Sequence, residues 1–450
     1  MGAFVSLLMH TSVVPPRTVG RMNARRYTRT TTRSRTTAVA LLAVTATLSG
    51  SLLGACSTDS SDSSDSTDSG TSVATSAAES SETTPGTAPA EQPVSCVGEI
   101  DPADSEAVRR AAASTLSVGV TGFDDAATAV DAGVRHIFIG STTDQSLLNG
   151  QGDPARSLAA LQERAGGDLA VSVDEEGGQV QRLADLTGPL PSAREMTATM
   201  APAEVTELFT DHARKLRDLG ITVDFAPDVD LDGGEAVSDN AIGDRAFSAD
   251  PAVVVEYGRA VIDGLLAGGV TPVIKHFPGH GHATGDSHLG TVTTPPIDQM
   301  GPDLQPFAEL AQVPGVAVMV GHMQVPGFDV EGVNGAETPA SLNPASYGLL
   351  RSGVNDAPGF DGVIYTDDLT GMQAITDHFS PGDAVVTALR AGADAPLVSS
   401  GMDAAAVSGV LDAVVAGVAD GSLDLGVVTT AADRICASGP ATGVPEPVNG

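Results

Sequence analysis

Lysine is nearly absent from this sequence. Of the 23 basic residues only Lys215 and Lys275 are lysines, and they stand against 57 acidic residues, which gives a formal net charge of −34 at pH 7. Nucleic acid and a bare anionic membrane surface repel such a chain, so we expect neither as a partner. A lysine this rare is also hard to explain as a solvated surface residue, and Lys275 is therefore a candidate functional residue.

Cysteine is almost as scarce, with Cys56, Cys96 and Cys436 the only examples. Cys96 and Cys436 lie near the two ends of the segment that can fold, and a catalytic thiol is not expected at such terminal positions. The export signal described next implies an oxidising compartment. We predict a disulfide between Cys96 and Cys436; the alternative is two free thiols.

The first residues have the pattern of an export signal. Residues 1–36 contain seven arginines and no acid, and the apolar stretch 38–56 follows, which is too short for a comfortable membrane span. Its ending, LGAC, matches the lipobox of bacterial lipoproteins, in which the signal is cut before a cysteine that takes a lipid. We predict a signal over 1–55 and lipidation of Cys56, with translation starting at Met1 or at Met22; the alternative is an incidental LGAC.

The next segment is rich in Ser, Thr, Asp and Pro and has few large apolar side chains. It cannot bury enough surface to offset its ordering entropy, so residues 56–97 are predicted to be a disordered tether. We expect a folded domain over 98–437 and a short tail over 438–450. A lipidated Cys56 would anchor the exported protein to the outer face of the cytoplasmic membrane.

The folded part alternates short apolar runs with longer amphipathic ones, among them 153–167, 205–220 and 250–269. Eight apolar strands separated by helices predict a (β/α)8 barrel in a single catalytic domain. A doubly wound sheet is the competing fold, but it would more naturally carry a glycine fingerprint after its first strand. The predicted strands are 115–120, 136–140, 169–174, 221–227, 271–276, 316–322, 362–368 and 395–400.

Polar residues follow several of these strands. Barrel enzymes keep their chemistry at the carboxyl ends of the strands, so six such positions together indicate an active site. For any one of them alone, a loop hydrogen bond or a helix cap is the competing interpretation. The six are Asp174, Lys275, His276, His322, Asp367 and Asp368.

The segment 275–290, KHFPGHGHATGDSHLG, contains four of the nine histidines. Their spacing matches no compact zinc pattern, and the glycines do not form a phosphate-binding GxxxxGK[ST] motif. We expect neither a metal nor another cofactor. A mobile loop that brings a proton donor over a bound ligand fits the histidine, aspartate and glycines better.

Four separated motifs resemble glycoside hydrolase family 3, in particular its β-N-acetylglucosaminidase branch. They are VDEEGGQVQRL (173–183), NAIGDRAFSAD (240–250), KHFPGHG with DSH (275–288) and GVIYTDDLTGM (362–372). The resemblance covers about residues 110–435. Two positions depart from the family pattern: Gln179 replaces a common arginine, and His282 stands in a segment that more often reads GHGDT.

The resemblance implies a role for each matching residue. It makes Asp367 the nucleophile and His288 the acid/base, paired with Asp286. For Asp368 the residues themselves leave two roles open, orienting a neighbouring residue or capping the next helix, and we favour the cap. The residues implied to hold sugar hydroxyls are Asp174, Arg182, Arg245, Lys275 and His276.

These residue types suit a retaining glycosidase, which needs an attacking carboxylate and a proton donor for the leaving oxygen. Imidazole titrates near neutral pH and can serve as acid and then as base. With no second domain expected, the barrel loops must supply the donor. We expect a monomer acting on N-acetylglucosamine glycosides from peptidoglycan; the alternatives are a phosphorylase and a non-catalytic glycan-binding lipoprotein.

Overall fold

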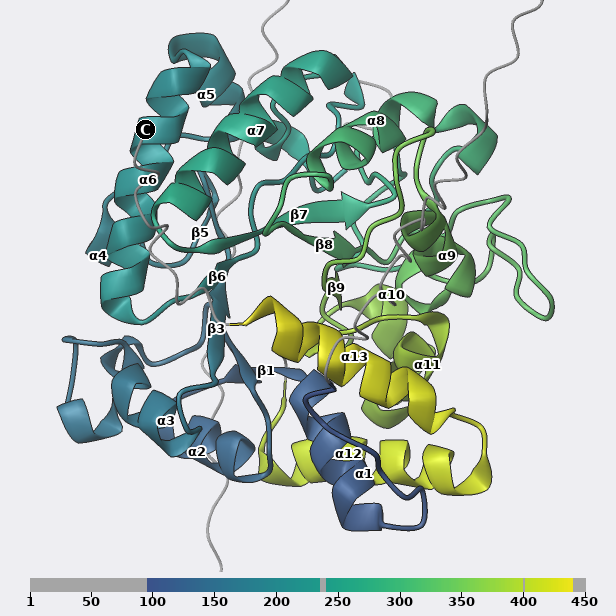
Figure 1. Cartoon of the computed structure of the whole chain (residues 1–450). Coiled ribbons are helices and arrows are strands. Elements are labelled where there is room, and N and C mark those ends of the chain that lie inside the picture. The colour runs from purple at the N-terminus through teal and green to yellow at the C-terminus, as the bar shows by residue number, and fades with distance from the viewer. Residues whose placement is uncertain (1–94, 235–239, 400, 440–450) are drawn as a thin grey trace, which may run out of the picture. The chain divides into compact units, whose positions relative to one another are not determined.

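The computed structural model describes residues 95–234, 240–399 and 401–439 (Figure 1). Several predictions concern segments outside the described residues, and they stay predictions. These are the export signal at 1–55, the lipidation of Cys56, the tether over 56–97 apart from its last three residues, and the tail over 438–450 apart from its first two.

Eight parallel strands form a closed barrel, which confirms the predicted (β/α)8 fold. Their order in the sheet is β10-β1-β2-β3-β6-β7-β8-β9, and a parallel bridge between Tyr365 and Ala395 joins β9 to the chain just before β10. Each strand lies within or overlaps a predicted one. The strands are β1 (Ser117–Val120), β2 (His136–Ile139), β3 (Ala170–Val173), β6 (Val223–Asp224), β7 (Thr271–Phe277), β8 (Ala317–Val320), β9 (Ile364–Thr366) and β10 (Leu397–Val398).

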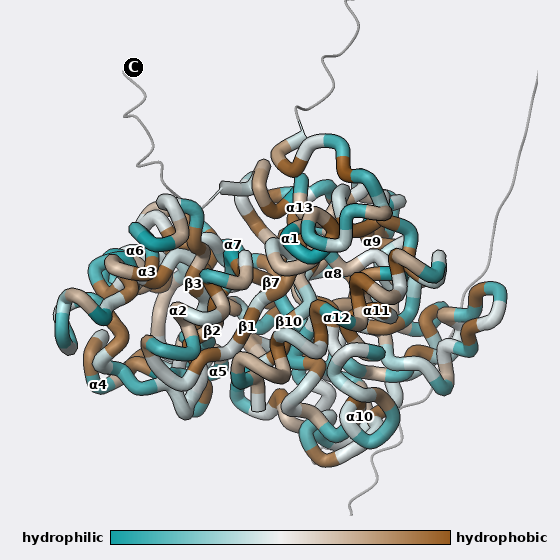
Figure 2. Tube along the Cα trace, turned by 90° about the horizontal axis from the view of Figure 1, so that it is seen from below, coloured by the Kyte–Doolittle hydropathy of each residue, from teal (hydrophilic) through white to brown (hydrophobic). Residues whose placement is uncertain are grey.

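The strands appear in the sequence as apolar runs because one face of each strand is buried in the barrel interior and the other is buried beneath the helices. One set of side chains fills the barrel interior, including the ring pair Phe138 and Phe225 and the ring of Tyr365. The other set packs beneath the helices in one continuous core. In Figure 2 the apolar segments accordingly concentrate at the strands and inner helix faces.

At least one helix follows each barrel strand, and the longer helices cover the outside of the barrel (Figure 1). Several begin at a residue whose side chain caps the first turn, as Asp250 does for α7, and α6 ends at Gly220, which has φ 96°. The helices are α1 (Ser105–Thr115), α2 (Phe123–Asp131), α3 (Leu158–Arg164), α4 (Ala184–Thr187), α5 (Ala193–Thr199), α6 (Pro202–Leu219), α7 (Pro251–Ala267), α8 (Gly301–Leu310), α9 (Pro344–Ser352), α10 (Gln373–Thr376), α11 (Pro381–Ala391), α12 (Ala404–Asp420) and α13 (Leu425–Ser438).

One predicted helix, 153–167, is divided in two. A 3-10 turn covers Pro154–Arg156, and α3 starts only at Leu158. Ser157 separates them because its hydroxyl accepts a hydrogen bond from the backbone N–H of Ala160, which makes it the cap of a new helix. Within the described part of the chain, none of the helices is both long and apolar enough to cross a membrane.

The two ends of the described chain are joined at one place. A disulfide connects Cys96 to Cys436 on α13, with the Cα atoms 6.3 Å apart. The Asp433 carboxylate on the same helix accepts hydrogen bonds from the backbone N–H of Cys96 at 2.7 Å and from the Ser95 hydroxyl at 3.0 Å. In Figure 1, α1 and α13 lie side by side, and they are in direct contact.

Removing this disulfide is expected to destabilise the barrel strongly, because the cross-link closes a loop of 340 residues in the unfolded chain. The entropy model gives about 6 kcal/mol for a loop of this length, whereas loss of a native disulfide typically costs about 2–5 kcal/mol. We therefore expect a loss of about 3–5 kcal/mol in the free energy of unfolding for Cys96→Ser with Cys436→Ser. Chemical denaturation of both proteins, with and without reductant, measures it. Equal stability of the variant and the oxidised wild type would contradict the expectation.

Candidate active site

A cavity of about 750 Å³ opens at the carboxyl ends of the barrel strands. It is the position at which barrel enzymes carry their chemistry. Eight of the residues singled out in the sequence line it together, although they come from five separate segments of the chain. They are Asp174, Arg182, Arg245, Lys275, His276, His288, Asp367 and Asp368.

Asp367 directly follows β9 and is held by the backbone. Its N–H donates to the carbonyl of Val320 on β8, and its Oδ1 accepts from the N–H of Asp368 at 2.8 Å. Burial acts to raise the pKa of this carboxyl, but the neighbouring imidazoles, first that of His322, outweigh it and lower the pKa to about 2. Asp367 is therefore ionised at neutral pH and faces the cavity.

Asp368 also lines the cavity, and the expectation that it caps the next helix is wrong, because α10 begins after Met372 without a side-chain cap. Its carboxylate accepts hydrogen bonds from the backbone N–H and hydroxyl of Thr370 and from those of Ser399 at the end of β10. Its carbonyl accepts from His322 Nε2 at 3.0 Å. These contacts fix the peptide that follows Asp367, which orients the Asp367 carboxylate.

His288 and Asp286 form a hydrogen-bonded pair in the loop after β7. Nδ1 of His288 lies 2.8 Å from Asp286 Oδ1, and the same oxygen accepts from the His288 backbone N–H at 2.9 Å. Burial acts to raise the pKa of Asp286, but the two hydrogen bonds with His288 lower it, so this residue stays a carboxylate. With Nδ1 held in this way, Nε2 is the ring nitrogen left to exchange a proton with a ligand.

The loop that carries this pair is anchored at several points. Asn240 donates from Nδ2 to the carbonyls of His280 and Ala283, both at 2.7 Å. Beyond them, the backbone N–H of Ala374 donates to the carbonyl of Ser287 at 3.2 Å, which ties the loop to the segment after Asp367. This bond links the segments that carry His288 and Asp367, although 79 positions separate the two residues in the sequence.

Another part of the cavity wall is a network of alternating charges. Lys275 Nζ lies 2.8 Å from Asp174 Oδ1 and 2.7 Å from Glu176 Oε1. Arg245 binds the same Glu176 carboxylate through Nε at 2.8 Å and a second nitrogen at 2.7 Å. Arg182 makes the weakest contact, at 3.4 Å from Asp174, and so remains available to a ligand.

Burial and pairing together set the charges in this network. Burial acts to raise the pKa of Glu176, but Arg245 and Lys275 outweigh it and lower the pKa to about 2. Burial likewise acts to lower the pKa of Lys275, and its two carboxylate partners raise it above the ordinary value. The wall therefore offers fixed N–H donors beside fixed carboxylate acceptors, a pattern that matches sugar hydroxyls, which both donate and accept.

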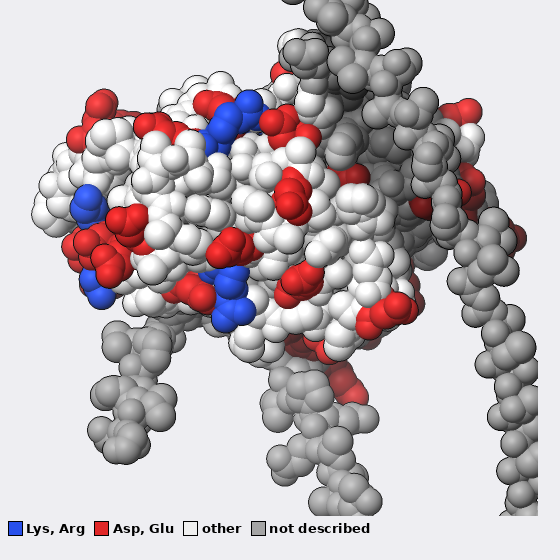
Figure 3. Space-filling view, turned by 90° about the horizontal axis from the view of Figure 1, so that it is seen from above, with Lys and Arg blue, Asp and Glu red and all other residues white. Residues whose placement is uncertain are grey.

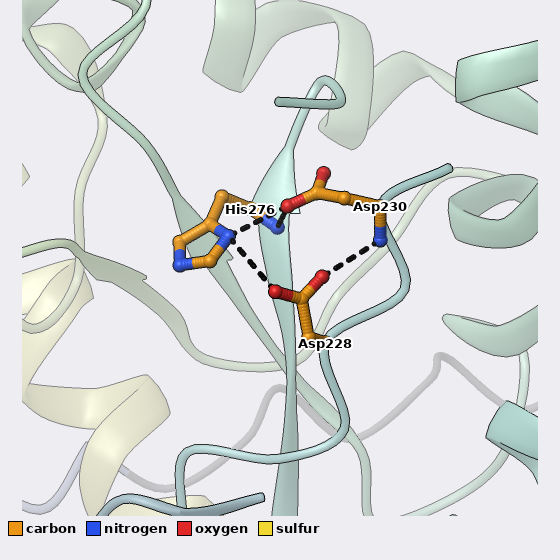
Figure 4. Close-up of side chains that lie close together, drawn as sticks. All are labelled: Asp228, Asp230 and His276. Atoms are coloured by element: carbon orange, nitrogen blue, oxygen red, sulfur yellow. Dashed lines mark hydrogen bonds and ion pairs between the residues drawn. The ribbon is translucent and has the colours of Figure 1, made fainter. Parts of the chain in front are cut away.

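Figure 4 shows a second group of buried acids behind His276. Asp230 Oδ2 lies 2.7 Å from His276 Nδ1, and the Asp230 N–H donates to Asp228 Oδ1 at 2.9 Å. Burial raises the pKa of Asp230 to about 7, and burial together with Asp230 raises that of Asp228 well above its usual range. The group thus fixes the His276 ring, whose Nε2 lies 3.4 Å from Arg245.

These same three residues have ligand atoms within 4.8 Å of one another, close enough to bind a metal ion. The charges around them oppose it, because the guanidinium of Arg245 already lies 3.1 Å from Asp228 Oδ2. A cation at that point would be repelled by the buried arginine. The group is better described as support for His276 than as a metal centre.

The two departures from the family motifs have structural roles. Gln179 donates from Nε2 to Asp244 at 2.8 Å and so links the loop after β4 (Glu175–Gly177) to the turn that carries Arg245. His282 Nδ1 lies 2.7 Å from Asp303 near the start of α8, and this hydrogen bond raises the pKa of His282. Neither residue lines the cavity.

Sequence reasoning missed three residues of the site: Glu176, Asp228 and Asp230. The sequence does carry a signal for them: acidic residues stand at every second position after a strand, so their side chains point to the same side. In the stretch 174–176, Asp174 and Glu176 line the cavity, whereas Glu175 between them is fully buried and lies 3.1 Å from His212 on α6. Asp228 and Asp230 alternate in the same way after β6.

A barrel whose catalytic end carries an ionised aspartate, a histidine and a wall of paired charges defines a glycoside hydrolase type of site. The comparison with known families agrees. Residues 128–437 match the model described as the glycosyl hydrolase family 3 N terminal domain, and the chain belongs to that family.

Individual relatives cover most of the described domain. The chain is 46% identical to the Beta-hexosaminidase LpqI of Mycobacterium tuberculosis over 330 residues, which are 72% of this chain and 80% of that protein. A solved structure of a family GH3 glycosyl hydrolase from Mycobacterium smegmatis is 49% identical, with a TM-score of 0.68, and covers 75% of this chain and 98% of that one. A family 3 beta-N-acetylglucosaminidase from a Paenibacillus species is 29% identical, with a TM-score of 0.64 over 73% of this chain and 61% of its own.

Proposed function

We propose that this glycoside hydrolase, a β-N-acetylhexosaminidase, removes terminal N-acetylglucosamine from cell-wall glycans with retention of configuration. The observation that carries the proposal is the convergence of Asp367, His288 and the charged wall on one cavity. An ionised carboxylate on one side and an imidazole with a free Nε2 on another are the two groups that a retaining glycosidase requires. The names of the relatives support the choice of an N-acetylhexosamine as the sugar.

In the first step, the Asp367 carboxylate attacks the anomeric carbon while His288 Nε2 donates its proton to the leaving oxygen. The bond from the anomeric carbon to that oxygen breaks, and a glycosyl ester on Asp367 forms. In the second step His288 accepts a proton from water, which attacks the anomeric carbon and frees Asp367. Asp286 stabilises the imidazolium and holds the ring, as a carboxylate does for a catalytic histidine.

The alternative acceptor is phosphate, since an imidazole, unlike a carboxylate, does not repel it. Incubation with a disaccharide of N-acetylglucosamine, with and without phosphate, separates the two activities. We expect free N-acetylglucosamine in both reactions and an unchanged rate. Release of the sugar 1-phosphate would replace the hydrolase proposal by a phosphorylase, and no release from any N-acetylglucosaminide would favour a glycan-binding protein.

We further propose that a lipid on Cys56 anchors the protein to the outer face of the cytoplasmic membrane. The lipobox in the sequence supports this, and so does the disulfide, which fits an oxidising compartment. Cys56→Ala is expected to move the protein from the membrane fraction to the soluble or unprocessed pool. Fractionation followed by immunoblotting measures it, and unchanged membrane retention would contradict the proposal.

A further inference from the structure

The loop tip that carries His288 also presents an apolar side chain to solvent. Leu289 is 76% exposed, and Val330, at 39%, is the other large hydrophobic side chain exposed in the described part of the chain. An exposed leucine forgoes the free energy of burial, about 25 cal/mol for each Å² of apolar surface. Leu289 directly follows His288, the proposed proton donor, in the sequence.

The backbone fixes where this side chain lies. Residues 286–289 form a turn in which the Leu289 N–H donates to the Asp286 carbonyl at 3.0 Å. Two glycines with positive φ bound the turn, Gly285 at 77° and Gly290 at 153°. His288 lines the cavity, and the exposed Leu289 is the next residue in the same turn.

The chemistry places the leaving group close to this turn. For proton transfer, His288 Nε2 must approach the glycosidic oxygen to about 3 Å. The first atoms of the leaving group are bonded to that oxygen, and the neighbouring Cα of Leu289 is only about 3.8 Å from that of His288. A pyranose ring in the leaving group has a face of C–H groups, which an aliphatic side chain can cover and remove from water.

We propose that Leu289 forms the binding subsite for the leaving-group sugar by packing against the apolar face of its ring. The proposal rests on the hydrolase activity and on the role of His288 proposed above. It makes Leu289 a residue that distinguishes sugar leaving groups from small ones. The charged wall recognises the other sugar, the one that is transferred to Asp367.

Two substrates with similarly basic leaving oxygens test it. One is the β-1,4 disaccharide of N-acetylglucosamine, whose leaving group is a sugar, and the other is methyl β-N-acetylglucosaminide, whose leaving group is methanol. For Leu289→Ala we expect kcat/KM to fall about fivefold to tenfold on the disaccharide, because the variant loses part of the apolar surface that the leaving-group sugar covers. On the methyl glycoside, which has no such sugar, we expect a fall of less than about twofold. Leu289→Met keeps an apolar side chain of similar size and should retain the wild-type rates on both. Val330→Ala is the matched control, an exposed apolar truncation away from the cavity, and should change neither.

Equal losses on the two substrates would overturn the proposal, because they would show that Leu289 acts through the position of His288. Unchanged rates on both would overturn it too. A wild-type enzyme that hydrolyses neither substrate would instead refute the proposed function. Thermal unfolding of Leu289→Ala should match that of the wild type, since the side chain is exposed.

Discussion

Replacement of Asp367 by asparagine is expected to lower kcat by about 10⁴-fold or more, the range seen when a nucleophile is removed from a covalent mechanism. The amide keeps the shape of the side chain and can still accept from the Asp368 N–H, so the fold and the turn should survive. It cannot attack the anomeric carbon as the ionised carboxylate does. Initial rates on an aryl N-acetylglucosaminide, together with thermal unfolding, measure both effects.

Asp361→Asn is the matched control for this change. Asp361 is exposed and lies just before β9, so its substitution removes one carboxylate from the segment that leads into this strand, at the end away from Asp367. We expect wild-type rates. An Asp367→Asn enzyme within about tenfold of the wild type would exclude Asp367 as nucleophile.

His288→Ala is expected to cost about 10²–10⁴-fold in kcat/KM on the disaccharide and far less on a nitrophenyl glycoside. A nitrophenolate leaves as a stable anion, whereas a sugar oxygen needs a proton as the bond breaks. Asp286→Asn should give a milder loss of the same form, because the imidazole remains but loses the carboxylate held 2.8 Å away. Steady-state kinetics on both substrates measure the pattern.

A role for His288 in metal binding predicts a different outcome. Both leaving groups would then suffer alike, and a chelator would abolish the activity of the wild type. Either result would remove His288 from its proposed role. His282 lies in the same loop and bonds Asp303 outside the cavity, so His282→Asn is the control, and its losses should not depend on the leaving group.

The barrel could be predicted because its strands are buried on both faces and therefore appear as apolar runs. The same runs locate the strand ends, and for this reason Lys275, His276 and Asp367 could be named from the sequence. Family motifs added His288 and Arg245, which lie in loops without regular pattern. Their convergence on one cavity is a finding of the structure.

The partners of these residues could not be predicted in the same way. The contact of Arg245 with Glu176 joins positions 69 apart, and that of Lys275 with Asp174 joins positions 101 apart. Such contacts depend on how loops cross above the barrel, which no local pattern records. The overall charge does not predict these pairs either. Figure 3 shows acidic side chains spread over the visible face, whereas in the site buried cations are paired with buried carboxylates.

The central claim is that the sugar is transferred to Asp367, and trapping the intermediate tests it most directly. A slow fluorinated N-acetylglucosamine substrate should leave a covalent glycosyl group on the enzyme, which proteolysis and mass spectrometry locate. We predict a single labelled peptide that contains residues 362–372, with the sugar on Asp367. A label on Asp368 or on another residue, or turnover with no covalent adduct under conditions that slow its hydrolysis, would contradict the account.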